Sequence, residues 1–267
     1  MIYLRGFEFS KNKSMTKNIY PYNTLPSHKL DTVFFDSITM LYGGNASGKS
    51  TLLNIIANRC QIEGKISSSA YGEPFFQYVS ECKAILEEEV SSIPKKSAYL
   101  KSEDILNEVK QVEEEKTMLD AYIRHCAKTL GIENADASTL KRKLNKIKLK
   151  QAMENLEFSK EKYSNGEVAL QILDDELEAD ALYLLDEPET SLSPRNQIKL
   201  AAELNKKARL LGCQFIIATH SPFLLGILDG NIYDLDQKTI VEKNWYDLEN
   251  MKEYYTFFKE RENCFKA

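Results

Sequence analysis

Gly43-Gly44-Asn45-Ala46-Ser47-Gly48-Lys49-Ser50-Thr51 is the stretch of sequence that decides the fold. It matches the phosphate-loop pattern G-x-x-x-x-G-K-[ST], whose glycines let successive backbone N–H groups point at phosphate oxygens. The apolar stretch Ile38–Tyr42 before it predicts a strand, and Leu52–Arg59 after it predicts a helix. Lys49 would supply a charge for the β- and γ-phosphates, and Ser50 a hydroxyl ligand for Mg²⁺. The sequence therefore predicts an α/β fold that binds a nucleoside triphosphate through Gly43, Asn45, Ala46, Ser47, Gly48, Lys49, Ser50 and Thr51.

A second apolar strand, expected over Ala181–Leu185, ends in two carboxylates, Asp186 and Glu187. This is the Walker B arrangement, in which Asp186 would hold Mg²⁺, usually through water. Glu187 would polarise the attacking water as a general base. Taken alone, the segment fits equally well a strand that ends in a solvated acidic turn. The phosphate loop in the same chain favours the Walker B interpretation.

A third apolar strand, expected over Gln214–Thr219, ends at His220. A lone histidine at the end of a strand is usually structural. Here it follows the Walker B strand and one helix, Pro194–Leu211, which has proline in its first turn and glycine after its end. That position favours a role for His220 as the sensor of the γ-phosphate. We therefore expect Glu187, His220 and Lys49 to be the catalytic residues.

The composition is that of a globular protein. Of the 267 residues 43% are hydrophobic and 28% charged, which excludes a collagen-like or wholly disordered chain. No apolar run approaches the roughly 20 residues of a membrane-spanning helix, and no secretory signal is evident. The five cysteines lie far apart, so we expect reduced thiols in a cytoplasmic protein. Since the net charge is −5, contact with nucleic acid would require a local basic patch.

Composition divides the chain into three parts. We expect residues 1–80 to form an N-terminal β subdomain with the phosphate-loop part of the core. Residues 81–165 would form a helical lobe, and residues 166–267 the C-terminal part of the same composite core. Within the lobe, apolar residues recur at the spacing of an amphipathic helix, as at Ile105, Leu106, Val109 and Val112. The lobe is either an insertion with a binding role or a solvated helical hairpin that acts only as a spacer.

The lobe also contains two segments of opposite charge. Lys141–Lys150 carries six basic residues and no acid, whereas Glu103–Asp120 carries seven acids and two bases. Such segments most often form solvated helix faces, which here could pair with each other. The alternative is that Lys141–Lys150 contacts the phosphate backbone of a nucleic acid, which requires clustered basic residues and no sequence code.

The order of the motifs resembles that of the ATP-binding cassette (ABC) class of ATPases. Ser164-Asn165-Gly166-Glu167 resembles the signature motif, with Asn and Glu where Gly and Gln are commonest. Ser191-Leu192-Ser193-Pro194 resembles the D-loop, with Ser193 where transporters usually carry Asp. Asp186-Glu187-Pro188-Glu189 and Thr219-His220-Ser221-Pro222 are closer to the soluble branch of SMC, RecF and OLD-type proteins. The chain most closely resembles small stand-alone bacterial predicted ATPases of the "AAA family". The resemblance includes the segment Ile232–Asp236 after the last of these motifs.

The resemblance implies a RecA-like P-loop core with an N-terminal β-rich subdomain, an inserted α-helical lobe and ATP hydrolysis with Mg²⁺. It further implies a homodimer in which two subunits hold two ATP molecules head to tail. Ser164 and Gly166 of one subunit would then contact the γ-phosphate bound by the other. Gln77 is the candidate for the Q-loop glutamine, which would contact both the nucleotide and Mg²⁺. Tyr20 and Tyr22 are candidates for stacking on adenine, although tyrosine beside proline also fits a packed turn.

Three functions remain open at this point. By analogy with the family, ATP hydrolysis would drive a change of shape on a nucleic acid or a protein partner, as in DNA repair or phage defence. The second function is that of the ATP-binding energy subunit of a transporter. Against it stand Ser193 in the D-loop and the long lobe. The third is a nucleotide-gated scaffold with little turnover.

Overall fold

The computed structural model describes residues 1–12, 19–22, 32–64, 72–110, 165–237 and 239–266, with the side chains of 165 and 166 left out. The chain forms two compact units. The first comprises Met1–Ser102 and Asp175–Ala267, and the second comprises Glu103–Asp174. Among the residues described, no helix is both long and apolar enough to cross a membrane.

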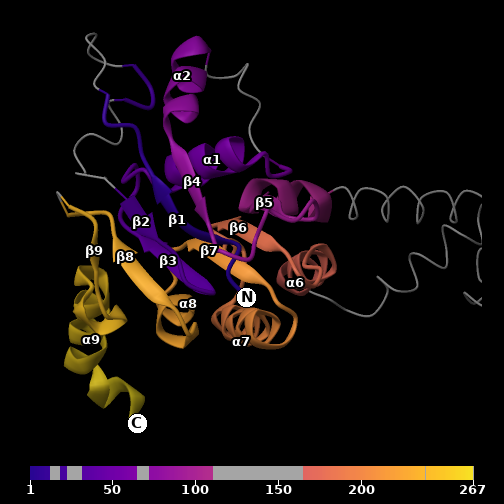
Figure 1. Ribbon diagram of the computed structural model, residues 1–267. Helices are drawn as coiled ribbons and strands as arrows, with labels where there is room; N and C mark the ends of the chain where they lie inside the picture. Colours follow the sequence, from indigo (N-terminus) through magenta and orange to yellow (C-terminus); the bar gives the residue numbers. More distant parts are fainter. Residues whose placement is uncertain (13–18, 23–31, 65–71, 111–164, 238, 267) are drawn as a thin grey trace, which may run out of the picture. The chain divides into compact units, whose positions relative to one another are not determined.

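A six-stranded sheet forms the centre of the first unit, in the order β5-β6-β7-β3-β8-β9 (Figure 1). The strands in that order are Ala98–Lys101, Leu182–Asp186, Gln214–Ala218, Ile38–Tyr42, Asn231–Asp234 and Val241–Glu242. The first five strands are mutually parallel, and β9 pairs antiparallel with β8. Every residue of β3, β6 and β7 is buried, which explains why these strands are continuous apolar runs in the sequence. The three strands that the sequence predicted are confirmed.

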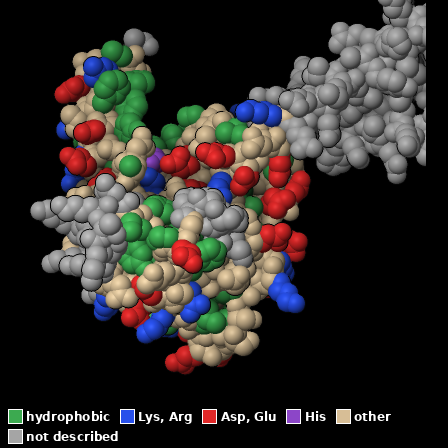
Figure 2. Space-filling view, turned by 90° about the horizontal axis from the view of Figure 1, so that it is seen from above, with side chains coloured by type: hydrophobic (Ala, Val, Ile, Leu, Met, Phe, Trp, Pro, Cys, Tyr) green, Lys and Arg blue, Asp and Glu red, His purple; other side chains and the backbone are tan. Residues whose placement is uncertain are grey.

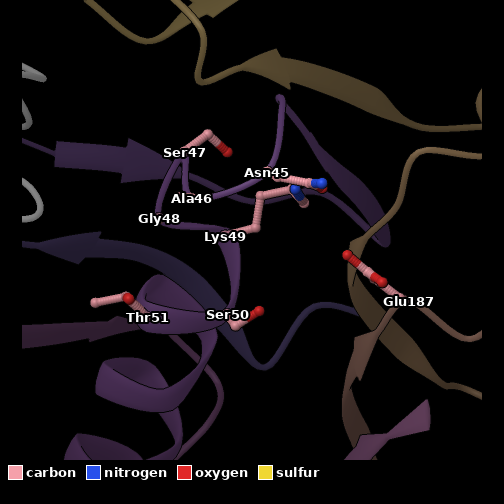
Figure 3. A pocket seen from close by; sticks show the side chains of 8 residues that line it. All are labelled: Asn45, Ala46, Ser47, Gly48, Lys49, Ser50, Thr51 and Glu187. Carbon is pink, nitrogen blue, oxygen red and sulfur yellow. The ribbon is translucent and has the colours of Figure 1, made fainter.

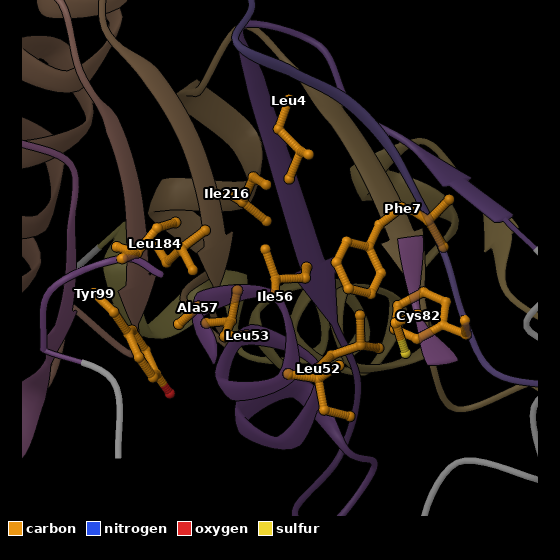
Figure 4. Packing of buried hydrophobic residues seen from close by; sticks show 14 of the residues in the cluster. Leu4, Phe7, Leu52, Leu53, Ile56, Ala57, Cys82, Tyr99, Leu184 and Ile216 are labelled. Atoms are coloured by element: carbon orange, nitrogen blue, oxygen red, sulfur yellow. The ribbon is translucent and has the colours of Figure 1, made fainter. Parts of the chain in front are cut away.

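A smaller antiparallel sheet has the order β2-β1-β4, with β1 over Leu4–Glu8, β2 over Thr32–Phe34 and β4 over Lys83–Leu86. Helix α1 (Lys49–Cys60) packs against strands of both sheets. The core between them includes Phe7 from β1, Leu53 and Ile56 from α1, and Ile216 from β7, all fully buried (Figure 4). Burying a large aliphatic or aromatic side chain contributes about 1.5–3 kcal/mol, so this cluster fixes α1 and the loop before it.

Two further helices lie on the other side of the large sheet (Figure 1). Helix α7 (Pro194–Leu210) covers the face of the large sheet opposite to α1 (Figure 1). Helix α8 (Pro222–Ile227) packs against α7. Gly212 adopts a φ of 64° just past the end of α7, which matches the expected glycine. The remaining elements are α2 (Glu73–Glu81), α6 (Asn165–Glu176), α9 (Glu249–Glu260) and the short 3₁₀ helices η2 (Trp245–Asp247) and η3 (Glu262–Phe265).

Strands β4 and β5 lie within the segment that we expected to be helical. The second unit begins at Glu103 and not at Glu81, so both strands belong to the first unit. Each has only four residues, and the partner of β4 is β1, about 80 positions earlier in the chain. Such short strands are specified by their distant partners, and the charged residues around them hide their local pattern. The expected helical periodicity is present at 102–110, where Ile105 and Val109 are buried.

Candidate functional site

The phosphate-loop segment connects the end of β3 to the start of α1. The turn into the helix occurs at Gly48, whose φ of 98° is one that residues with a Cβ rarely adopt. A Cβ on Gly43 would lie 2.6 Å from the hydroxyl of Ser47, so the loop closes tightly on itself. It surrounds a pocket of about 450 Å³ (Figure 3). The lining residues are Asn45, Ala46, Ser47, Gly48, Lys49, Ser50, Thr51 and Glu187.

Lys49 lies buried at the base of this loop. Its ammonium donates to the carbonyl of Gly43 at 2.8 Å and to that of Gly44 at 3.2 Å. It also lies 2.6 Å from Nε2 of His220. Burial lowers the pKa of Lys49, and the carboxylates of Glu187 and Asp186 oppose that shift. The loop therefore holds a lysine whose charge is balanced by neighbouring acids.

Asp186 ends β6 beside the first turn of α1. Its Oδ1 accepts a hydrogen bond from the Ser50 hydroxyl at 3.1 Å, and its Oδ2 accepts one from the Tyr99 hydroxyl at 3.1 Å. Burial raises the pKa of Asp186, while these two hydrogen bonds lower it. The hydroxyl and carboxylate oxygens of Ser50 and Asp186 thus lie side by side. Oxygens of this kind are the ligands that Mg²⁺ prefers, commonly one or two from the protein beside substrate phosphates.

Glu187, which lines the pocket, lies next to the His220 side chain. The distance from Glu187 Oε1 to His220 Nε2 is 3.5 Å, and Glu187 has a φ of 51°. Burial lowers the pKa of His220, and the charge of Lys49 lowers it further. A neutral imidazole can accept at Nε2 the hydrogen that Lys49 donates. Figure 2 shows histidine (purple) at the surface beside acidic side chains (red).

Three further residues contact the site, although the sequence did not indicate them as candidate site residues. The Tyr99 hydroxyl binds Asp186, and Asp236 Oδ1 accepts from the backbone N–H of Gly44 at 2.6 Å. Glu189 binds the loop that carries His220. Asp236 lies just after the end of β8, which runs parallel to β3. Tyr99 lies inside β5, and its side chain reaches Asp186 at the end of the neighbouring strand β6. Polar residues at the carboxyl ends of neighbouring parallel strands converge, so recognising β8 in the sequence would have indicated Asp236 but not Tyr99.

Some of the residues predicted to bind nucleotide or nucleic acid lie away from this pocket, and others lie outside the residues that the structure describes. Gln77 is exposed on α2, where its amide donates to Glu81 at 3.4 Å, and it does not line the pocket. Gly166 falls in the first turn of α6, whereas Ser164 and Lys141–Lys150 lie outside the described residues.

The two tyrosines proposed for adenine are both engaged in packing. Tyr20 stacks on Phe75 at a centroid distance of 5.8 Å, and Tyr22 is buried edge-on against Tyr78 at 4.9 Å. Both pairs join the N-terminal segment to α2. This geometry favours the packed-turn alternative for the two tyrosines.

The fold is of the P-loop α/β type found in ABC ATPases, and the site lies where that fold places its phosphate loop. The glycine-rich loop follows β3, Asp186 ends β6 and is followed by Glu187, and β7, which lies between these two strands, leads to His220. The motifs, separated by up to 171 positions in the sequence, meet around Lys49. This arrangement confirms the predicted fold class.

Part of the chain matches the model of a known family. Residues 130–226, less than half of the chain, match a family described as "AAA domain, putative AbiEii toxin, Type IV TA system". No curated protein matches the sequence.

Among solved structures, the chain is similar to a nucleotide-free ATP-binding cassette from an ABC transporter. The identity is 16%, the TM-score 0.45, and the alignment covers 96% of each chain. It is similar to cbiO1 from Clostridium perfringens, part of the ABC transporter complex cbiONQ, at 16% identity and TM-score 0.42, covering 98% and 96%. A third is the Smc head domain derived from Pyrococcus furiosus, at 12% identity and TM-score 0.40, covering 98% and 100%.

Proposed function

We propose that this protein binds ATP with Mg²⁺ and hydrolyses it to ADP and phosphate. The observation that carries the proposal is that Lys49 and Glu187 line one pocket and both lie close to His220, next to the Ser50–Asp186 hydrogen bond. Lys49, Glu187 and His220 come from three different motifs of the sequence. A role confined to packing gives no reason for a lysine, two acids and a histidine to gather at a phosphate loop.

Each residue takes the role that its chemistry allows. The loop N–H groups and Lys49 bind the phosphates, and Ser50 and Asp186 hold Mg²⁺, which when bound would neutralise charge on the β- and γ-phosphates. Glu187 orients and deprotonates the attacking water as general base. His220, within 3.5 Å of Glu187, contacts the γ-phosphate and helps to fix both groups in place. Gln77 remains a candidate for a contact with nucleotide and Mg²⁺ after a rearrangement of α2.

The resemblance supports a wider proposal in which ATP joins two copies of the chain head to tail. Ser164 and Gly166 of each copy would contact the γ-phosphate held by the other. Hydrolysis would then separate the copies and move the second unit relative to its target. That target is a nucleic acid, through Lys141–Lys150, or a protein in the cytoplasm.

The test is the rate of ATP turnover by the purified chain, compared with Glu187→Gln. Removing a general base costs about 10²–10⁴-fold, so the variant should bind ATP but turn it over at least about a hundredfold more slowly. The matched control is Glu203→Gln on α7, because Glu203 is exposed and pairs with Lys206. Equal turnover by Glu187→Gln would refute the assigned base. Tight ATP binding by the unaltered chain without turnover would favour the nucleotide-gated scaffold.

A further inference from the structure

The carboxylate of Glu189 binds three consecutive residues of the loop that follows β7. Its Oε1 accepts a hydrogen bond from the Thr219 hydroxyl at 2.7 Å. The same oxygen accepts from the backbone N–H of His220 at 2.8 Å and from that of Ser221 at 3.1 Å. One oxygen from the segment after the Walker B pair therefore fixes the backbone on both sides of the His220 side chain.

A second connection runs between the same two segments. The Ser221 hydroxyl donates to Oε1 of Gln197 at 2.7 Å, and the Gln197 amide donates to the carbonyl of Leu192 at 2.9 Å. The loop that carries His220 is thus bound at one end by Glu189 and at the other, through Gln197, by Leu192. Both anchor points lie in the segment that begins with Glu187.

The geometry of His220 depends on this attachment. Its Nε2 approaches Lys49 to 2.6 Å and Glu187 to 3.5 Å, and the ring is held only by its own backbone and these two groups among the contacts described. A shift of the loop by an ångström would change both distances. Displacements of that size at a catalytic centre can lower a rate about a hundredfold.

Retaining a carboxylate at position 189 has a cost. Burial raises the pKa of Glu189, and its second oxygen, Oε2, is buried without a hydrogen-bond partner in the described part of the chain. A buried unpaired acceptor typically destabilises a protein, so the three hydrogen bonds on Oε1 must offset that cost. Charge-assisted bonds to backbone N–H groups are among the strongest available for holding a loop.

We propose that Glu189 is a positioning residue that acts through His220. It fixes the loop after β7 so that the imidazole meets Lys49 and Glu187. The inference rests on the proposed function, because it assigns to Glu189 a part in the same reaction. It also gives a route by which movement of the Ser191–Pro194 segment would reach His220.

The kinetic test is a double-mutant cycle between Glu189→Ala and His220→Ala. If Glu189 acts through His220, Glu189→Ala should lower kcat about 10- to 100-fold while the Kd for ATP stays within about threefold. Adding Glu189→Ala to His220→Ala should then change kcat by less than about twofold. Glu189→Gln retains an oxygen acceptor and should restore most of the rate. Multiplicative losses in the double variant would overturn the inference, because they indicate independent roles.

A second measurement needs no turnover and separates this inference from the proposed function. The imidazole resonances of His220, assigned by their loss in His220→Ala, report the environment of the ring in NMR spectra. They should move toward those of solvent-exposed histidine in Glu189→Ala and remain in place in Glu189→Gln. Thermal unfolding would show that the variants are folded. If the resonances do not move in Glu189→Ala, the inference is wrong whatever the turnover. If they move in a chain that does not hydrolyse ATP, the positioning stands and the hydrolase proposal falls.

Discussion

The Tyr99 hydroxyl donates a hydrogen bond to Oδ2 of Asp186 at 3.1 Å, between two adjacent strands of the large sheet. Because Ser50 binds the other oxygen, both carboxylate oxygens of Asp186 are oriented by neighbours. Replacing a group that orients a metal ligand in this way typically lowers metal affinity by about 10- to 100-fold. Tyr99 therefore orients a residue of the proposed site, Asp186, as Glu189 does for His220.

Replacing Tyr99 with phenylalanine should weaken Mg²⁺ binding. We expect the Mg²⁺ concentration for half-maximal ATP turnover to rise about tenfold. Losing a hydrogen bond to a charged group should also lower the free energy of unfolding by about 1.5–3 kcal/mol, measured by urea denaturation. Tyr183→Phe is the control, because the Tyr183 hydroxyl binds the backbone of Glu178. It should lower stability without changing the Mg²⁺ dependence. An equal Mg²⁺ effect in both variants would contradict the assignment.

Replacing Lys49 with alanine should weaken nucleotide binding. Lys49 is the buried cation at the pocket, and we expect the Kd for ATP, measured by calorimetry, to rise at least about tenfold because a charge-assisted contact to phosphate is lost. Lys199→Ala, at an exposed position of α7, removes the same charge away from the pocket and should leave the Kd unchanged. Unchanged binding by Lys49→Ala would refute the phosphate-loop assignment.

The sequence predicted those strands and site residues that can be identified from the residues next to them in the chain. It did not predict contacts that depend on pairing between distant segments. The motif strands β3, β6 and β7 are continuous apolar runs, each followed by its polar motif, so their sequences alone indicated both strand and site. Strand β5 is four residues long and is defined by its pairing with β6, so Tyr99 could not be placed beside Asp186 in advance. Glu189 was noted only as part of a family motif. Its hydrogen bonds to Thr219 and His220 span about 30 positions and require the folded loops.

The pH dependence of stability should report the burial of His220. Its pKa lies below the ordinary 6.5 because of burial and Lys49, so the unfolded chain binds a proton before the folded one does. The contribution of His220 to stability is therefore complete above pH 6.5 and is lost as the pH falls through 6.5 toward the folded pKa. The raised pKa values of Asp186 and Glu189 act in the opposite direction.

A comparison with His220→Asn isolates this contribution, because the two carboxylates are present in both proteins. Urea denaturation at pH 8 and pH 5 should show that the unaltered chain loses more stability on acidification than His220→Asn does. Equal losses in the two proteins would show that the pKa of His220 is not lowered in the folded chain.

Glu187→Gln should trap the proposed head-to-tail dimer. If ATP joins two copies and hydrolysis separates them, slowing hydrolysis must prolong the joined state. With saturating ATP and Mg²⁺, light scattering should therefore show a mass of about twice the 30.6 kDa of one chain. The double variant Lys49→Ala/Glu187→Gln should remain at the mass of one chain, because it lacks the lysine expected to bind the phosphates. A monomeric Glu187→Gln under conditions where calorimetry shows bound ATP would remove the dimer from the mechanism and leave hydrolysis within a single chain.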